Sequence, residues 1–117
     1  MKEFLFVYRT EYNTLSDRSP EEMQASMKKW MDWMGGIAAQ NKLASRGNRL
    51  VDGQGKVVSQ HNVITDGPYM EIKEALGGYS IINADSLDEA AEIAKGCPIF
   101  EVGGNVEVRE IAVMNID

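Results

Sequence analysis

The sequence predicts an α+β sandwich of the ferredoxin-like kind, with two helices on one face of a mainly antiparallel sheet. Two observations predict this fold: two segments of helical periodicity each open on a capping motif, and strand-like segments lie before, between and after them. The resulting order is β-α-β-β-α-β with an extra hairpin, without a linker or an internal repeat. We therefore expect residues 1–117 to form one domain around one continuous core.

The first segment predicts a central strand. Phe4, Phe6 and Tyr8 share one face of this strand. Leu5 and Val7 share the other face, so both faces are largely apolar. A strand that is apolar on both faces needs cover on both sides.

The first helix is predicted to begin at Ser19-Pro20. Ser19 is the expected N-cap, Pro20 the first helical residue, and Glu22 is placed to complete a capping box. Apolar side chains then recur at steps of three and four residues as far as an end near Gln40. We expect this stripe to pack against the sheet as core. Its members are Met23, Met27, Trp30, Met31, Met34 and Ile37.

The middle of the chain predicts a β-hairpin. The residues Asp52-Gly53-Gln54-Gly55 are typical of a turn, and strand-like segments flank them at 48–51 and 56–58. Arg46 and Arg49 are expected to lie on the exposed part of a strand.

The second half of the chain predicts a strand, a helix and a last strand. One or two helical turns at 71–76 are expected to stop at the following glycines, before a strand over 79–84. Ser86 and Glu89 form a second capping box, which opens the second helix. The last strand is predicted over 106–113.

Two helices can cover only one face of such a sheet, so we expect a second copy of the chain to cover the other face. The residues assigned to this uncovered face are Leu5, Val7, Ser80, Ile82 and Ile111. Closed twofold dimers are the commonest oligomers, and a homodimer packed sheet to sheet is the simplest solution. The alternative is a monomer with one partly apolar face in solvent.

Composition excludes several classes of function. The net charge of −6 and the absence of a basic run argue against a nucleic-acid partner. No apolar run reaches membrane-spanning length and no signal-peptide core is present, so a cytoplasmic protein is expected. Cys97 is the only cysteine and His61 the only histidine, and no metal or other cofactor is predicted from them.

Several fragments together resemble the DGPF branch of the YCII-related family. The most specific are Asp66-Gly67-Pro68, Lys73-Glu74 and Gly77-Gly78 at this spacing. The resemblance implies a ferredoxin-like α+β fold that dimerises into an α/β-barrel-like assembly, related to small cofactor-free enzymes. It also implies a His–Asp pair as an active site in some relatives. This chain has Tyr69 where the branch usually has Phe.

Asp66 is the first candidate catalytic residue. Asp66-Gly67-Pro68-Tyr69 predicts a sharp turn, which fixes where the carboxylate and the Tyr69 ring point. In a dimer cleft, a desolvated Asp66 carboxylate would serve as an acid or base. The structural alternative, favoured by turn chemistry alone, is a carboxylate bonded to backbone N–H groups in an Asx-turn.

His61 is the second candidate, because its unperturbed pKa lies near neutrality. On a strand, His61 and Asp66 of one chain would point to opposite faces, so a His–Asp pair would have to form across the twofold axis. A hydrogen-bonded or surface histidine is the structural alternative.

Four further residues are candidates for ligand binding. Arg9 is suited to holding a substrate carboxylate, and Tyr8, Tyr69 and Tyr79 would supply phenol hydroxyls to a pocket. The structural alternatives are a strand-end charge for Arg9 and rim packing for the tyrosines.

Two classes of function remain open from the sequence. One is a small cofactor-independent enzyme with a pocket at the dimer interface and Asp66 as acid or base. The other is a dimeric module that binds a ligand or regulates a partner without chemistry.

Overall fold

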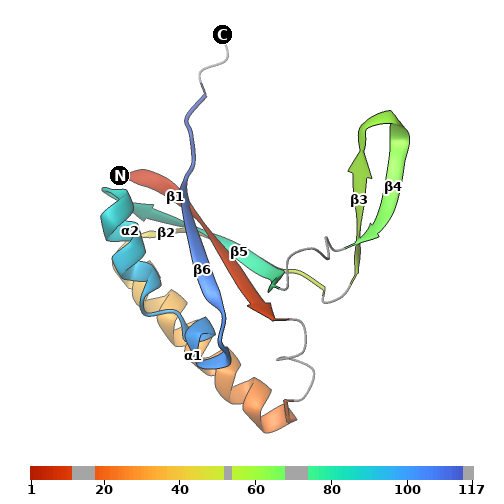
Figure 1. Cartoon of the computed structure of the whole chain (residues 1–117). Helices are drawn as coiled ribbons and strands as arrows, with labels where there is room; N and C mark the ends of the chain where they lie inside the picture. The colour runs from red at the N-terminus through yellow and green to blue at the C-terminus, as the bar shows by residue number, and fades with distance from the viewer. Residues whose placement is uncertain (12–17, 52–53, 68–73, 115–117) are drawn as a thin grey trace.

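The computed structural model describes residues 1–11, 18–51, 54–67 and 74–114. The elements in chain order are β1 (Lys2–Glu11), α1 (Pro20–Ala39), β2 (Leu43–Arg49), β3 (Gly55–Ser59), β4 (Val63–Gly67), β5 (Glu74–Ala84), α2 (Leu87–Ala94) and β6 (Asn105–Glu110) (Figure 1). Short 3₁₀ turns lie at Gln60–Asn62 and Pro98–Val102.

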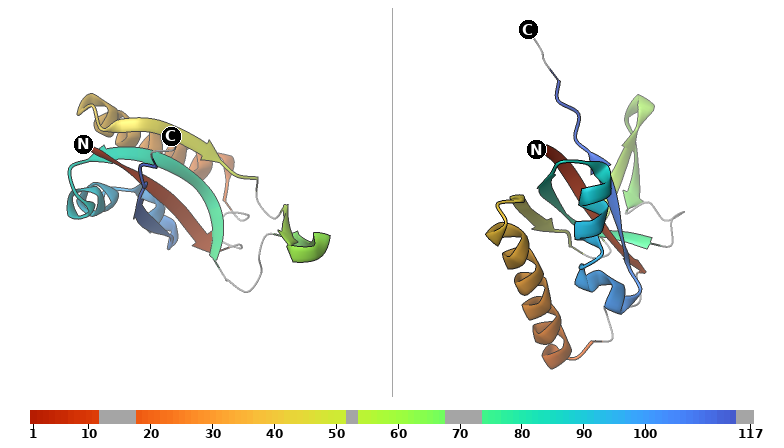
Figure 2. Two further views of the ribbon diagram at one scale, coloured as in Figure 1. Left: turned by 90° about the horizontal axis from the view of Figure 1, so that it is seen from above. Right: turned by 90° about the vertical axis from the view of Figure 1, so that its left-hand side faces the viewer.

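Four strands form one antiparallel sheet in the order β2-β5-β1-β6, with β1 and β5 in the centre. Both helices lie on the same face of this sheet (Figure 2). The predicted α+β fold of the ferredoxin-like kind is therefore confirmed, as is the central position of the first strand.

The core lies between this sheet and the two helices. Phe4 and Phe6 are fully buried there, opposite Ile82 and Ser80 of β5 in the strand register. The assignment of Ser80 and Ile82 to the uncovered face was therefore wrong. The register of pairing with β1 decides which residues of β5 face the helices. The apolar pattern of β5 alone cannot show which of its two faces is buried.

Tyr79 and Ile81, which pair with Val7 and Leu5, take the places on the uncovered face. That face is thus still partly apolar. No helix lies over it in the views of the described residues (Figure 2).

Both helices begin at the predicted caps. The Ser19 hydroxyl accepts the Glu22 backbone N–H at 3.1 Å, and the Ser86 hydroxyl accepts the Glu89 backbone N–H at 3.1 Å. Each bond satisfies one N–H of the first helical turn that has no partner inside the helix. The end of α1, with Gln40 as its C-cap, also agrees with the prediction.

Only the second half of the α1 stripe packs as core. Met34 and Ile37 are buried, but the exposed fractions of Met23, Met27 and Met31 are 47%, 63% and 56%. The expectation that all the methionines fill the core was therefore wrong. Met23 and Met27 instead border a cavity beneath the first half of α1.

The middle hairpin is not the predicted one. β2 pairs with β5, and β3 pairs with β4 through the turn at Gln60–Asn62. His61 and Asn62 both have positive φ, of 63° and 62°, in the three-residue loop between the paired residues Ser59 and Val63. Because neither residue is glycine, this turn could hardly be predicted from the sequence.

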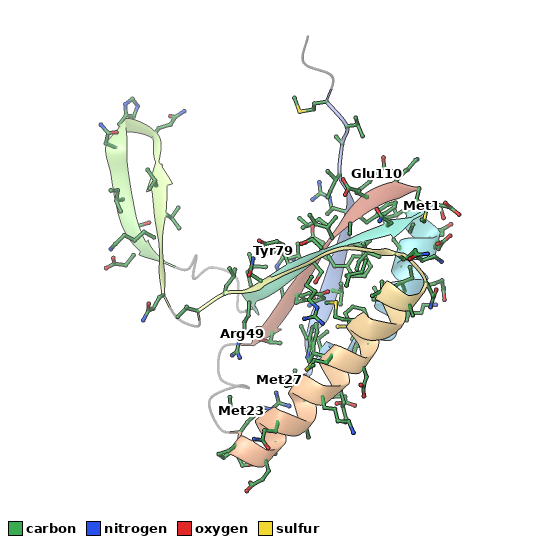
Figure 3. All side chains as sticks on the ribbon, turned by 180° about the vertical axis from the view of Figure 1, so that it is seen from behind. Met1, Met23, Met27, Arg49, Tyr79 and Glu110 are labelled. Carbon is green, nitrogen blue, oxygen red and sulfur yellow. The ribbon has the colours of Figure 1, made fainter. Side chains whose placement is uncertain are left out.

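The expected helical turns at 71–76 are also wrong where the structure describes them, because Glu74 to Leu76 belong to β5. The hairpin of β3 and β4 stands away from the main sheet (Figures 1 and 3).

Candidate functional site: a cavity beneath the first half of helix α1

A cavity of about 340 Å³ lies between the first half of α1 and the adjacent ends of β1, β2 and β5. This volume falls within the usual range of small-molecule sites, roughly 300–1,000 Å³. The lining residues are Tyr8, Thr10, Arg18, Met23, Ser26, Met27, Trp30, Met34, Arg46, Gly47, Asn48, Arg49, Gly77, Gly78, Tyr79, Ser80, Ile99 and Val102.

The wall on the helix side is apolar. Met23, Met27, Trp30 and Met34 contribute to it from successive turns of α1. The Trp30 ring is held edge-on against the Tyr8 ring, with 4.8 Å between ring centroids and an interplanar angle of 85°. This wall combines one fixed aromatic surface with methionine side chains that adapt to the shape of an occupant.

Three arginines also line the cavity, Arg18 from the α1 side and Arg46 and Arg49 from β2. The lining includes neither Asp nor Glu among the residues that the structure describes. The Arg18 Nη1 contacts Ser26 Oγ at 3.5 Å, and neither Arg18 nor Arg46 forms an ion pair with a described residue. Arg49 lies at the end of β2, across from Met23 and Met27 (Figure 3).

Tyr8 lies within the cavity wall with its hydroxyl shielded from solvent. Within the described residues this hydroxyl makes no hydrogen bond of ordinary geometry, and the neighbouring Ser80 hydroxyl donates to the Arg46 carbonyl at 2.7 Å. Burial raises the pKa of Tyr8 far above its usual value, and the Ser80 hydroxyl offsets only part of this rise. The Tyr8 hydroxyl is therefore a donor without a partner of ordinary geometry among the described residues.

Two glycines bring the backbones of β2 and β5 close together beside the cavity. A Cβ on Gly47, whose φ is +68°, would lie 1.7 Å from the Tyr79 carbonyl oxygen. A Cβ on Gly78 would lie 2.7 Å from the Asn48 carbonyl oxygen. Only glycine fits this close approach, which shapes the wall between the two strands.

The two candidate catalytic residues lie on the hairpin and not among the residues that line the cavity. The Asp66 carboxylate is 91% exposed and pairs with Lys56 Nζ at 2.7 Å. His61 is exposed in the turn at the hairpin tip, so its expected strand position was wrong. Pro68 and Tyr69, which complete the predicted turn after Asp66, lie outside the described residues.

The remaining binding candidates are divided between the two faces of the sheet. Tyr8 and Tyr79 both border the cavity, but by strand parity the Tyr79 side chain belongs to the uncovered face of the sheet, and its hydroxyl accepts from Asn48 Nδ2 at 3.1 Å. Arg9 follows Tyr8 and pairs with Glu107 of β6 away from the cavity lining. The Arg109 and Arg9 guanidinium groups together lower the pKa of Glu107.

A family model for the YCII-related domain matches residues 1–115. The chain belongs to the YCII-related family. No curated protein shows significant similarity to the sequence.

Three further findings concern the described residues of this YCII-related domain. In the parts of the chain that the structure describes, no helix is long and apolar enough to cross a membrane. Within the same parts, no three His, Cys, Asp or Glu side chains are grouped as a metal site would require. Cys97 is buried, and this burial raises the pKa of its thiol to about 12, which disfavours the reactive thiolate.

Sequence reasoning missed the arginines of this YCII-related site. Arg46 and Arg49 are exposed, as expected for a strand surface, but they lie on the rim of the cavity. The available signal was the glycine between them. Gly47 and Gly78 lie in paired strands, and glycine inside a strand often marks a close approach of backbones.

Proposed function

We propose that this YCII-related protein binds a small organic anion with an apolar body in the cavity beneath α1. One observation carries the proposal: Arg18 and Arg46 line an apolar cavity and form no ion pair with a described residue, in a chain whose net charge is −6. Such arginines are suited to bind a carboxylate from outside, which they hold through paired N–H donors.

The lining of the cavity indicates the two parts of the ligand. The anionic group would lie near Arg46 of β2 and Arg18 at the start of α1, which both line the cavity. The apolar part would lie against Trp30 and Met27, where contact with the aromatic ring and the thioether favours an aromatic or branched aliphatic group. The ligand class is therefore a compact aromatic or branched carboxylate.

The same geometry favours binding without acid–base chemistry. The described lining contains no His, Cys, Asp or Glu, and Tyr8 is held protonated. The non-catalytic ligand-binding module is thus our preferred function. In a homodimer packed sheet to sheet, a cofactor-independent enzyme of the DGPF branch would need Asp66 and His61 to come from the hairpin of the second copy.

The test is a titration of the purified protein with benzoate, phenylacetate and 3-methylbutanoate, each paired with its neutral amide. Isothermal calorimetry and tryptophan fluorescence report binding, because Trp30 lines the cavity. We expect the acids to bind about tenfold or more tightly than their amides, as a charge-assisted contact requires.

Variants then locate the binding site. Arg46→Ala should remove most of the preference for the acid over the amide. Arg109→Ala is the matched control, because Arg109 is exposed outside the cavity lining, beside Glu107, and should leave binding unchanged. Equal affinity for acids and amides, or an equal loss in both variants, would contradict the proposal. Any conversion of a bound acid to a product would favour the enzyme.

A further inference from the structure

Three exposed methionines follow one flank of α1 at steps of four residues. Met23, Met27 and Met31 are all exposed, whereas Met34 of the same helix is buried in the core. Single apolar side chains on a surface are ordinary, but a row of them on a helix occupies positions that are usually polar. Core packing therefore does not account for these three thioethers.

The cavity divides this row of methionines. Met23 and Met27 line it beside the Trp30 ring (Figure 3), but Met31 does not, although it lies about one turn further along α1. Two of the exposed thioethers thus belong to the candidate binding site. The third serves as an internal reference, because it is an exposed residue of the same type on the same helix.

Thioether sulfur is oxidised by hydroperoxides. The sulfur lone pair attacks one oxygen of hydrogen peroxide, the O–O bond breaks, and an S–O bond forms. The proton on the transferred oxygen passes to the departing hydroxide, so the peroxide is reduced to water and the sulfur loses two electrons to become a sulfoxide. A methionine sulfoxide reductase returns the sulfoxide to the thioether. Because the peroxide must reach the sulfur, exposure favours oxidation of Met23 and Met27 over Met34.

A sulfoxide would make this part of the cavity wall polar. Its oxygen is a hydrogen-bond acceptor, which water satisfies while the cavity is open. An apolar ligand group packed on the same wall would displace that water, and an acceptor covered without a donor opposes binding. Oxidation therefore disfavours the contact made by the apolar part of the ligand. Arg18 and Arg46, which would meet the anionic group, have no part in this reaction.

We propose that Met23 and Met27 form a reversible oxidation site, through which a hydroperoxide releases the organic acid from the cavity. The inference rests on the proposed function and adds its regulation. Ligand and oxidant require the same two side chains, so the control acts in both directions. Oxidation weakens binding of the acid, and bound acid shields the two sulfurs from the peroxide.

The first experiment follows the oxidation of each methionine when the purified protein is treated with hydrogen peroxide. Peptide mass spectrometry gives the rates for Met23, Met27, Met31 and Met34, with and without phenylacetate, or whichever of the three test acids binds most tightly. Without ligand, the exposed methionines should react faster than Met34. Acid at about ten times its Kd leaves about a tenth of the sites free, so Met23 and Met27 should slow about threefold or more while Met31 is unchanged.

The second experiment measures the affinity for the same acid before and after peroxide treatment in three proteins. Wild type and Met31→Leu should each lose about tenfold in affinity, and methionine sulfoxide reductase should restore it. The double variant Met23→Leu with Met27→Leu offers no thioether at these two positions. Its own affinity should therefore be the same before and after treatment.

Three results would each overturn the oxidation site and leave the proposed function standing. In the first, the acid binds equally well to reduced and oxidised wild type. In the second, the acid slows Met31 as much as Met23 and Met27. In the third, the double variant loses as much affinity as wild type on treatment. If none of the test acids binds the reduced protein, the proposed function and the oxidation site both fail.

Discussion

At the scale of single residues, the Tyr8 hydroxyl is a buried polar group that lacks a hydrogen-bond partner of ordinary geometry among the described residues. A buried hydroxyl without a partner costs about 1–3 kcal/mol, so Tyr8→Phe should raise the free energy of unfolding by about 1 kcal/mol. Urea denaturation of the ligand-free protein measures this change.

The ring contact between Tyr8 and Trp30 would survive in this variant, because phenylalanine keeps the same ring. A loss of stability in Tyr8→Phe would show that an ordered water or an undescribed residue already satisfies the hydroxyl.

Asp66 should matter little to folding. Its carboxylate is 91% exposed and its partner Lys56 is 65% exposed, and such surface pairs contribute at most about 1 kcal/mol. We expect Asp66→Ala and Lys56→Ala each to change the free energy of unfolding of the monomer by less than about 0.5 kcal/mol. A cost of about 1 kcal/mol or more in Asp66→Ala alone would instead support the structural turn, with bonds to residues after Gly67.

The sequence predicted which strand a residue belongs to better than which residues lie beside it in the fold. Tyr8 and Tyr79 do border the cavity, because both belong to the central strands beside it. The locations of Asp66 and His61 could not be predicted, since they depend on which strands pair, and that pairing is a long-range property. The same holds for Arg46 and Arg49. Their exposure on a strand could be predicted from local sequence, but their place beside the cavity depends on α1, which is distant in the sequence.

At the scale of elements, two glycines offer a matched test of backbone geometry. Gly36 lies in α1 with open space at its Cβ position, so Gly36→Ala should stabilise the protein by about 0.5–1 kcal/mol through helix propensity. Gly47 has positive φ and faces the Tyr79 carbonyl, so Gly47→Ala should cost at least about 2 kcal/mol. Thermal and urea denaturation of both variants check the opposite signs.

Gly36→Ala also tests whether the glycines near the end of α1 serve close packing. A destabilised Gly36→Ala would mean that another surface approaches α1 there.

The elements differ in how well sequence alone could place them. The caps at Ser19 and Ser86 were predictable because a cap depends on residues within three positions of it. The hairpin was not, because a turn with positive φ at His61 and Asn62 lacks the usual glycine. The face of Ser80 could not be predicted either, since a change of one residue in register reverses the inward side of a strand.

At the scale of the whole molecule, stability should fall in acid. Arg109 and Arg9 lower the pKa of Glu107, and the hydrogen bond from Lys42 is the main cause that lowers the pKa of Glu89. A folded pKa below the unfolded value of about 4.3 means that each carboxylate contributes stability above that pH and loses it as the pH falls through the folded pKa.

The variant Glu89→Gln with Glu107→Gln should therefore be less stable than wild type near neutrality, and it should lose less stability on acidification. Urea denaturation at about pH 6 and about pH 3.5 gives both slopes. Parallel slopes for the two proteins would mean that other carboxylates cause the acid sensitivity.

The unfilled space beneath α1 has a consequence for the lifetime of the protein. Met23 and Met27 line this cavity and are 47% and 63% exposed. A bound ligand would cover part of this exposed apolar surface. A ligand at a hundred times its Kd adds about 2.7 kcal/mol to the free energy of unfolding. When opening is fast relative to cleavage, proteolysis of the native chain should slow by the same factor as the open population falls, about a hundredfold, so the supply of the small acid would set how long each molecule survives.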